Sequence, residues 1–309
     1  MVVLKNPIIL HKPNEMIYLL LCILSSAAVL VTFKFAERLK VNTFSAILVN
    51  YITACLAGFF LANGDVKPLL NLNIGTVIFM LILGAMFISV FRLIGLSTQR
   101  AGVAVTSVAA KMSVILPILF SVWIDANDSL NTIKIVGIVL ALVSVLLTTY
   151  KKEKLTHGSA GLYLPLIIFI GIGIIDSSVK YAQTTFVTNE LNPIFNSAVF
   201  AIAGTIGFAI LPFNKAAANN LKHIKTWILG VVLGLVNFGS MYFMIAALNH
   251  TDALTGKQMQ GSILFGINNI GVVVASVFLG LMLFKERPTR TNWAGILLSV
   301  VSIVILAYS

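Results

Sequence analysis

The chain has 309 residues, of which 59% are hydrophobic and only 10% are charged. Soluble domains carry about 25% charged residues, so this composition argues against a soluble enzyme or a nucleic-acid-binding protein and predicts an all-α integral membrane protein. The net charge of +11 resides mostly in short connections between apolar runs. Basic residues in such connections set the orientation in the membrane and contact lipid headgroups.

Hydropathy predicts about ten transmembrane helices, preceded by a tail at residues 1–15. The tail lacks a continuous apolar core and a small-residue cleavage site, so it is not expected to be a cleavable signal peptide. The predicted spans are residues 16–33, 43–62, 74–96, 103–124, 132–150, 160–182, 193–213, 227–248, 262–284 and 292–308. Turn residues separate several of them, as at 63–65, 125–131 and 157–159.

Lys111 is the only formally charged residue in the predicted span 103–124, which also contains Pro117. A lysine near the bilayer centre costs a few kcal/mol, about 2.5–3.5 on insertion scales, so it is retained mainly where a cavity, a counter-charge or a substrate compensates. We therefore predict that Lys111 lies at the centre of a binding cavity. The alternative is a lysine that reaches the nearer interface or forms a structural pair within the bundle.

Three sequence patterns recur in the same order in the two halves of the chain. FKFA at residues 33–36 recurs as VKYA at 179–182, Val41-Asn42 recurs as Leu191-Asn192, and KIVGI at 134–138 recurs as NWAGI at 292–296. Each half holds five spans, an odd number, so the second half must enter the membrane from the opposite side. The predicted organisation is a first repeat at 16–152, a linker at 153–159 and a second, inverted repeat at 160–309.

These features resemble the drug/metabolite transporter superfamily in its ten-helix, EamA-like branch. The resemblance covers nearly everything after Met16. It rests on Lys34 and Lys180, one in the first helix of each repeat, on Pro117 in the fourth helix, and on the turn at 284–287 followed by Trp293. The resemblance implies a transporter in the cytoplasmic (inner) membrane of a bacterium. The first repeat departs from the family pattern, because it offers Asp125 and its neighbours at the equivalent turn.

Three further charged residues lie within the predicted spans, namely Arg92, Asp176 and Lys180. Asp176 and Lys180 are four residues apart, so they share a helix face and are able to pair. The pair could be a structural salt bridge or could take part in transport. Arg92 lies near the end of its span, where a side chain that reaches the interface is the favoured interpretation.

The ninth span and the residues before it combine amides with glycines. Gln258 and Gln260 precede the span, and Asn268 and Asn269 lie inside it, with glycines at 256, 261, 266 and 271. This pattern predicts a locally unwound helix whose amides line a cavity. For the glycines themselves, close packing through small residues is the favoured interpretation, as Gly230 and Gly234 are expected to provide in the eighth span, whereas the four amides are expected to line a cavity.

The leading functional hypothesis is a secondary transporter that moves a small metabolite by alternating access. The membrane-depth cations Arg92, Lys111 and Lys180 outnumber Asp176, which favours an anionic or zwitterionic solute such as an amino acid or an organic acid. The alternatives are an exporter of cationic drugs, an intramembrane enzyme or a non-transporting scaffold. The predicted substrate-binding residues are Lys111, Asp176, Lys180, Asn268, Asn269, Gln258, Gln260 and Arg92.

No motif for a metal, a phosphate or a catalytic nucleophile is present, so the sequence predicts neither an enzyme nor a cofactor. The expected partners are the solute and membrane lipids, with no nucleic acid; a proton and sodium are the alternatives for a coupling ion. Monomer and homodimer remain alternatives. With an even number of spans both termini share a side; basic loop residues favour an external location, whereas the resemblance implies a cytoplasmic one.

Overall fold

The computed structural model describes residues 13–100, 109–126, 128–149, 160–251, 258–284 and 289–308. These residues form α-helices joined by short connections, with one isolated β-bridge between Thr251 and Gln258 and no strand in the described ranges. The predicted all-α class is confirmed.

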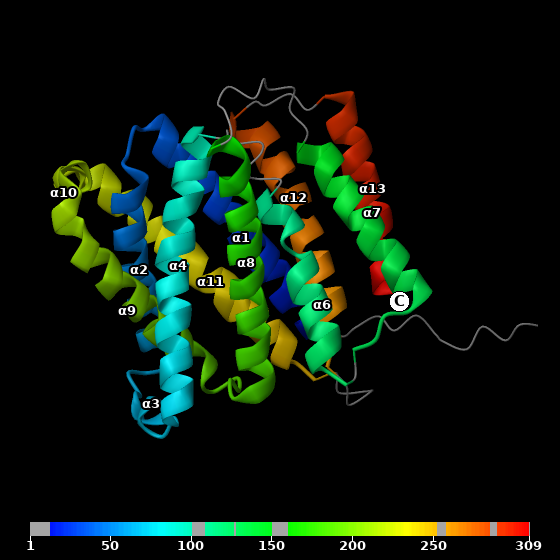
Figure 1. The fold of residues 1–309 in the computed structure, drawn as a ribbon, viewed down its shortest axis with the longest axis horizontal. Helices are drawn as coiled ribbons and strands as arrows, with labels where there is room; N and C mark the ends of the chain where they lie inside the picture. Colours follow the sequence, from blue (N-terminus) through cyan, green and yellow to red (C-terminus); the bar gives the residue numbers. More distant parts are fainter. Residues whose placement is uncertain are drawn as a thin grey trace, which may run out of the picture.

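The described residues form nine long helices and one shorter apolar helix of the bundle (Figure 1). The long helices are α1 (Pro13–Arg38), α2 (Thr43–Leu61), α4 (Ile74–Arg100), α7 (Thr132–Thr149), α8 (Ala160–Thr185), α9 (Asn192–Ile210), α11 (Ile224–Asn249), α12 (Gly261–Phe284) and α13 (Arg290–Ala307). The shorter one is α6 (Ile115–Ile124), and the connections contain the small helices α3 (Lys67–Leu70), η1 (Leu211–Phe213) and α10 (Lys215–Asn220).

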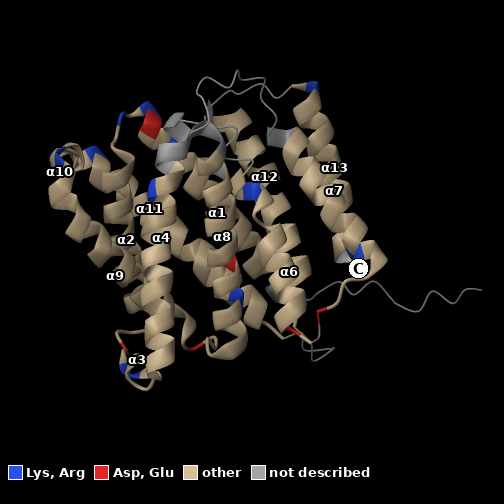
Figure 2. Ribbon diagram, viewed as in Figure 1, with Lys and Arg blue, Asp and Glu red and all other residues tan. Residues whose placement is uncertain are grey.

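Within the described part of the chain, seven helices are long and apolar enough to cross a membrane, namely α1, α2, α4, α8, α9, α11 and α12. Three shorter apolar helices, Ala109–Ile124, Thr132–Leu147 and Arg290–Leu306, coincide with the predicted fourth, fifth and tenth spans. Figure 2 shows most of the charged residues near the two ends of the bundle and few along the middle of the helices. Apolar outer surfaces with charges at the ends are the arrangement that a bilayer requires.

Local signals set the helix ends where the sequence predicts turns. The Asn42 side chain accepts a hydrogen bond from the Ser45 N–H at 3.1 Å and so caps α2. At the other end of α2, Asn63 and Gly64 have positive φ angles of 52° and 70°, a conformation that turns the chain. Thr289 begins α13 with a reciprocal capping box. The turn predicted at 63–65 is thus confirmed.

Each helix packs mainly against helices from the other half of the chain. In the first half, α1 packs on α11 and α12, and α2 packs on α9 and α11. In the same way α4 packs on α8 and α9, and α6 packs on α8 and α12. Figure 1 shows α7 and α13 side by side along one edge of the molecule. The two halves are therefore interleaved rather than placed next to each other as separate bodies.

Glycines allow a close contact between α11 and α2. A Cβ atom on Gly230 would lie 2.4 Å from the Val49 Cβ, and one on Gly234 would lie 2.5 Å from the Thr53 Cβ. Any larger residue at these positions would push the helices apart. The packing role expected for this glycine pair is confirmed.

The prediction of an unwound ninth span is wrong for residues 261–271, because α12 is a continuous helix from Gly261 onward. Asn268 and Asn269 lie within it as helical residues. The glycines at 261, 266 and 271 do not interrupt the backbone, and each faces side chains of neighbouring helices at short distance. These glycines therefore serve close helix packing, as the other interpretation of the pattern expected. Gly256 lies outside the described residues.

Candidate functional site

The irregular backbone is found in the fourth span instead, directly after Lys111. The helix described from Ala109 is interrupted at residues 113 and 114 before α6 begins. Pro117 has no N–H and cannot donate to the Ser113 carbonyl, so that carbonyl accepts a hydrogen bond from the Leu116 N–H at 3.0 Å. A proline in the fourth span therefore tightens the turn that follows Lys111.

The Lys111 carbonyl has a partner from the second half of the chain. It accepts a hydrogen bond from Asn269 Nδ2 on α12 at 2.9 Å, in addition to a long 3.5 Å contact from the Val114 N–H. Irregular backbone at membrane depth is tolerated where protein groups satisfy its hydrogen bonds. Asn269 provides such a hydrogen bond, so α12 holds the interrupted backbone of the fourth span in place.

The Lys111 side chain lies deep in the protein, within electrostatic range of Asp176 on α8 and Cys22 on α1. No ion pair within 4.0 Å joins Lys111 to a carboxylate of the described residues. Lys111 and Asp176 also retain some accessible surface. Two opposite charges thus lie deep in the protein, remain partly accessible and do not form a direct ion pair.

Asn268 contributes a second unusual feature of α12. Its Oδ1 atom is buried and has no hydrogen-bond partner among the described residues. A buried acceptor without a partner costs about 1–3 kcal/mol, so its retention favours a role that the protein alone does not display. Asn268 immediately precedes Asn269, whose side chain holds the Lys111 carbonyl.

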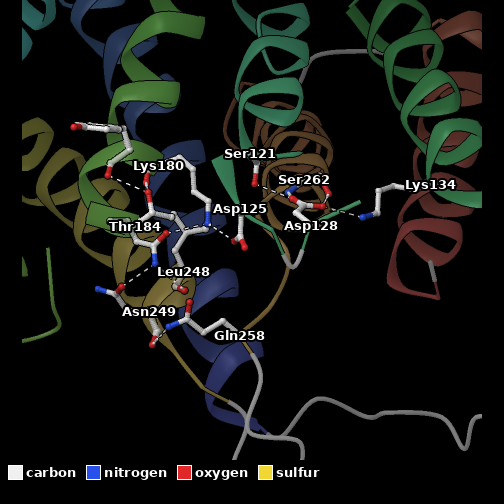
Figure 3. A network of polar contacts seen from close by, with 12 residues as sticks. Ser121, Asp125, Asp128, Lys134, Lys180, Thr184, Leu248, Asn249, Gln258 and Ser262 are labelled. Carbon is white, nitrogen blue, oxygen red and sulfur yellow. Dashed lines mark hydrogen bonds and ion pairs between the residues drawn. The ribbon is translucent and has the colours of Figure 1, made fainter. Parts of the chain in front are cut away.

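A second polar group lies at the end of the bundle where α6 and α8 finish (Figure 3). Lys180 Nζ lies 3.2 Å from Asp125 Oδ2 and donates to Gln183 Oε1 at 3.0 Å. Gln183 Nε2 in turn donates to Asn249 Oδ1 at 3.0 Å. An open cavity of about 420 Å³ adjoins this chain of contacts and is lined by residues 183–188, Asp125 and Gln258, among others.

Asp128 forms a separate hub at the same end (Figure 3). It accepts hydrogen bonds from Lys134 Nζ at 2.9 Å, from Ser121 Oγ at 2.8 Å and from the Ser262 N–H at 2.8 Å. Burial by itself would raise the pKa of Asp128, but the hydrogen bonds from Ser262, Lys134 and Ser121 outweigh it and hold this pKa below its ordinary value. Lys134 is fully buried and also donates to Gln260 Oε1.

The predicted site residues therefore separate into three places. Lys111, Asp176 and Asn269 come together in the interior. Lys180 lies instead in the network at the end of the bundle, where it forms an ion pair with Asp125. The expected Asp176–Lys180 pair is therefore wrong, and Asp176 faces Lys111. Two charged residues on one helix face are able to pair, but Asp176 and Lys180 each interact with a different residue of a neighbouring segment.

The remaining predicted residues lie away from the interior. Gln258 is exposed, and its Nε2 donates to the Asn249 carbonyl at 3.4 Å. Gln260 is half-buried beside Lys134. Arg92 is exposed on the outer surface of α4, in keeping with the interpretation that it reaches toward the interface.

Sequence reasoning missed Asp125, Asp128, Lys134 and Gln183 as members of polar networks. Asp125 and Asp128 follow an apolar run directly, and such connection residues are usually exposed. The contact of Gln183 with Lys180 could have been predicted, because Gln183 lies three residues after Lys180 on one helix face. No sequence feature predicted the burial of Lys134, since a lysine at the start of a helix normally contacts solvent.

No group of three or more His, Cys, Asp or Glu side chains that could hold a metal ion occurs within the described ranges. Among the described residues, the site offers separated charges, amides and hydroxyls.

The long apolar helices of the described residues indicate a multi-pass helical membrane protein. An uncharacterized protein of Haemophilus influenzae (strain Rd) is 30% identical over 297 residues, which cover 94% of this chain and 97% of that protein. The chain belongs to the same family as this Haemophilus influenzae protein.

No protein-family model matches the chain. A solved crystal structure shares 13% sequence identity with a TM-score of 0.74, over 94% of this chain and 96% of its own. A likeness at this low identity shows that the helical arrangement occurs in another protein, and it shows the fold alone.

Proposed function

We propose that this protein is a secondary transporter, located in the cytoplasmic membrane of a bacterium, that moves a small zwitterionic or anionic metabolite by alternating access. The observation that carries the proposal is the opposition of Lys111 and Asp176 in the interior without a direct ion pair. Buried opposite charges normally close on each other because separation in a low-dielectric interior is costly. A solute that bridges them would remove that cost.

In the proposed complex, Lys111 contacts a negative group of the solute, such as a carboxylate. Asp176 contacts a positive group where the solute has one, as the ammonium of an amino acid. The Asn268 carboxamide oxygen, which has no partner among the described residues, accepts a further solute hydrogen bond. These three residues come from the fourth span, α8 and α12, so binding would draw elements of both halves together.

The helix packing supports an inverted-repeat architecture with ten spans. If α8 is equivalent to α1, α11 to α4 and α12 to the fourth span, the main packing contacts between the halves have counterparts under exchange of the halves. The packing of α1 on α11 corresponds to that of α8 on α4, and the packing of α1 on α12 corresponds to that of α8 on α6. In this scheme the fourth span and α12 exchange with each other, and their contact is the link between Lys111 and Asn269.

The polar networks at the end of α6 support a state that is closed on that side. The Lys180–Asp125 ion pair joins α8 to the connection after α6, and Asp128 joins the same connection to the first turn of α12. Both links cross between the halves. Alternating access would require these contacts to break when this end opens.

The test is transport by purified protein in liposomes. Untargeted metabolite comparison of cells with and without the protein supplies candidate solutes, and exchange of each labelled solute is then measured. Lys111→Met keeps the length of the side chain and removes its charge, and Asp176→Asn does the same for the carboxylate. A charge-assisted hydrogen bond contributes about 1.5–3 kcal/mol, so each variant is expected to raise KM by about 10- to 150-fold.

Arg92→Met is the matched control, because it removes a cation of a spanning helix whose side chain is exposed on the outer surface. Its transport should equal that of the native protein. If Lys111→Met is equally unaffected, the assignment of the interior site is wrong. Silence of the native protein across broad solute pools, including cationic drugs, would contradict transport itself.

A further inference from the structure

The connection between α9 and α11 leaves large apolar side chains exposed at one end of the bundle, where α10 lies at the outer edge (Figure 1). Phe213 is 89% exposed, Ile224 is 71% exposed and Trp227 is 43% exposed. Trp227 Nε1 donates to the Leu221 carbonyl at 2.8 Å, which fixes the indole. Because this segment directly joins two spanning helices, these side chains lie at the level of the membrane–water interface, where aromatic residues act as anchors.

The same connection is strongly basic. Lys215, Lys222 and Lys225 are all exposed, and residues 211–227 contain no Asp or Glu. Apolar anchors interspersed with lysines are the composition of segments that lie in the interface and bind anionic lipids.

Tertiary contacts bring further cations to this connection from a distant part of the sequence. The Asn42 N–H donates to Asn220 Oδ1 at 3.0 Å, and Ser45 Oγ donates to the Ala217 carbonyl at 2.9 Å. The α1–α2 turn, with exposed Glu37, Arg38 and Lys40 and a net charge of about +1, is thereby held beside α10. Figure 2 shows the resulting concentration of Lys and Arg at this end.

The corresponding connection in the first half, between α2 and α4, serves as an internal comparison. It also exposes large apolar residues, with Leu70 at 78% and Ile74 at 75%. Its charged residues are Asp65 and Lys67, which cancel. Apolar exposure is thus common to the two connections because both meet the membrane, whereas the excess of lysines occurs at only one and needs its own explanation.

We infer that residues 211–227, together with the α1–α2 turn, form a binding surface for the headgroups of anionic phospholipids in the cytoplasmic leaflet. The geometry supplies several ammonium and guanidinium donors at headgroup depth, and the apolar anchors hold them there. Anionic lipid is enriched on the cytoplasmic side, and basic residues are retained on that side. The end that contains α10 therefore faces the cytoplasm, and the start of α1 and the end of α13 lie on the external side.

Lipid binding is tested by native mass spectrometry of the purified full-length protein, titrated with phosphatidylglycerol or with phosphatidylcholine. The native protein should retain phosphatidylglycerol preferentially. Each lysine near an anionic surface contributes about a factor of five, so the triple variant Lys215→Gln, Lys222→Gln and Lys225→Gln should bind phosphatidylglycerol on the order of 100-fold more weakly. Lys67→Gln, on the opposite connection, should leave binding unchanged.

Three results would overturn the inference. The triple variant could bind phosphatidylglycerol as the native protein does. The Lys67→Gln control could lose binding to the same extent. Glycerol phosphate or inorganic phosphate could displace phosphatidylglycerol at equal concentration, which would identify a site for a soluble phosphate rather than for a lipid.

Orientation is tested by labelling whole cells with a membrane-impermeant thiol reagent, after the native cysteines Cys22 and Cys55 are replaced by serine. Asn219→Cys places a thiol on exposed α10, and Asn71→Cys places one on the exposed α2–α4 connection. We expect labelling at residue 71 in intact cells and at residue 219 only after lysis. The reverse pattern would contradict the cytoplasmic placement of α10.

Discussion

Asp128 illustrates at the residue scale how a charge is kept in the closed end of the bundle. The carboxylate is buried, and donors from α6, α7 and α12 surround it. A buried carboxylate is tolerated only when it is paired and its lone pairs are satisfied. The helices α6, α7 and α12 are therefore joined at this end through the side chain of Asp128.

We predict that Asp128→Ala destabilises the protein by about 3–5 kcal/mol, because it leaves the buried Lys134 ammonium without its counter-charge. The measurement is thermal unfolding in detergent. Glu190→Gln is the control, since Glu190 is an exposed carboxylate at the same end. Equal melting temperatures for Asp128→Ala and the native protein would contradict the role assigned to this hub.

The lowered pKa of Asp128 also predicts a dependence of stability on pH. The folded protein keeps this carboxyl ionised to a lower pH than the unfolded chain does, so its contribution is fully present above the ordinary pKa of 3.8. The contribution is lost as the pH falls below that value, through the lower pKa of the folded state. In Asp128→Asn the part of the acid destabilisation that comes from this group should be absent.

At the scale of elements, the interrupted fourth span is the most unusual helix of the described chain. Pro117 removes one backbone donor, the Ser113 carbonyl is satisfied within a tighter turn, and α12 caps the Lys111 carbonyl through Asn269. The interruption sets the position of Lys111 relative to α8. An element with a backbone break beside a charged site is suited to change shape when a solute binds.

We predict that Pro117→Ala maintains or slightly raises thermal stability, by up to about 1 kcal/mol, and slows transport. Alanine restores the N–H, so a regular helix could form through residues 113 and 114. Pro193→Ala is the matched control, because Pro193 lies in the first turn of α9, where the missing donor costs nothing. Faster transport in Pro117→Ala than in the native protein would show that the break is not needed.

At the scale of the whole molecule, the main packing pairs join the two halves of the chain. The helices α1, α2, α4 and α7 all pack chiefly on helices that follow residue 160. Within a half, neighbouring helices such as α1 and α2 make little contact. The buried apolar faces of one half are thus covered mainly by the other half.

We expect that residues 1–152 and residues 153–309, expressed separately, fail to accumulate, and that co-expression restores a complex. The measurement is co-purification of the first fragment with a tagged second fragment from membranes. Gly234→Leu in the second fragment should abolish the complex, because the new side chain would collide with α2 at Thr53. A stable, monodisperse 1–152 fragment would contradict this interleaved arrangement.

The sequence alone determined the all-α membrane class, the positions of most helices and the identification of Lys111 as an unusual charge within a predicted span. These conclusions depend on length, apolar composition and one isolated charge, which are properties of single segments. The predicted turn after α2 and the packing role of the glycine pair in α11 also follow from local residue types. Short-range chemistry therefore accounts for where the helices lie and which of their faces are unusual.

Only the tertiary structure decided which charges meet. Periodicity placed Asp176 and Lys180 on one helix face, but their partners come from the fourth span and from the connection after it, residues that lie tens of positions away in the chain. The break expected in α12 lies instead beside Lys111, because the side chain of Asn269 satisfies the backbone there. Partner choice in a membrane interior depends on which helices pack together, and that is set by the complementarity of whole faces rather than by the sequence of any one of them.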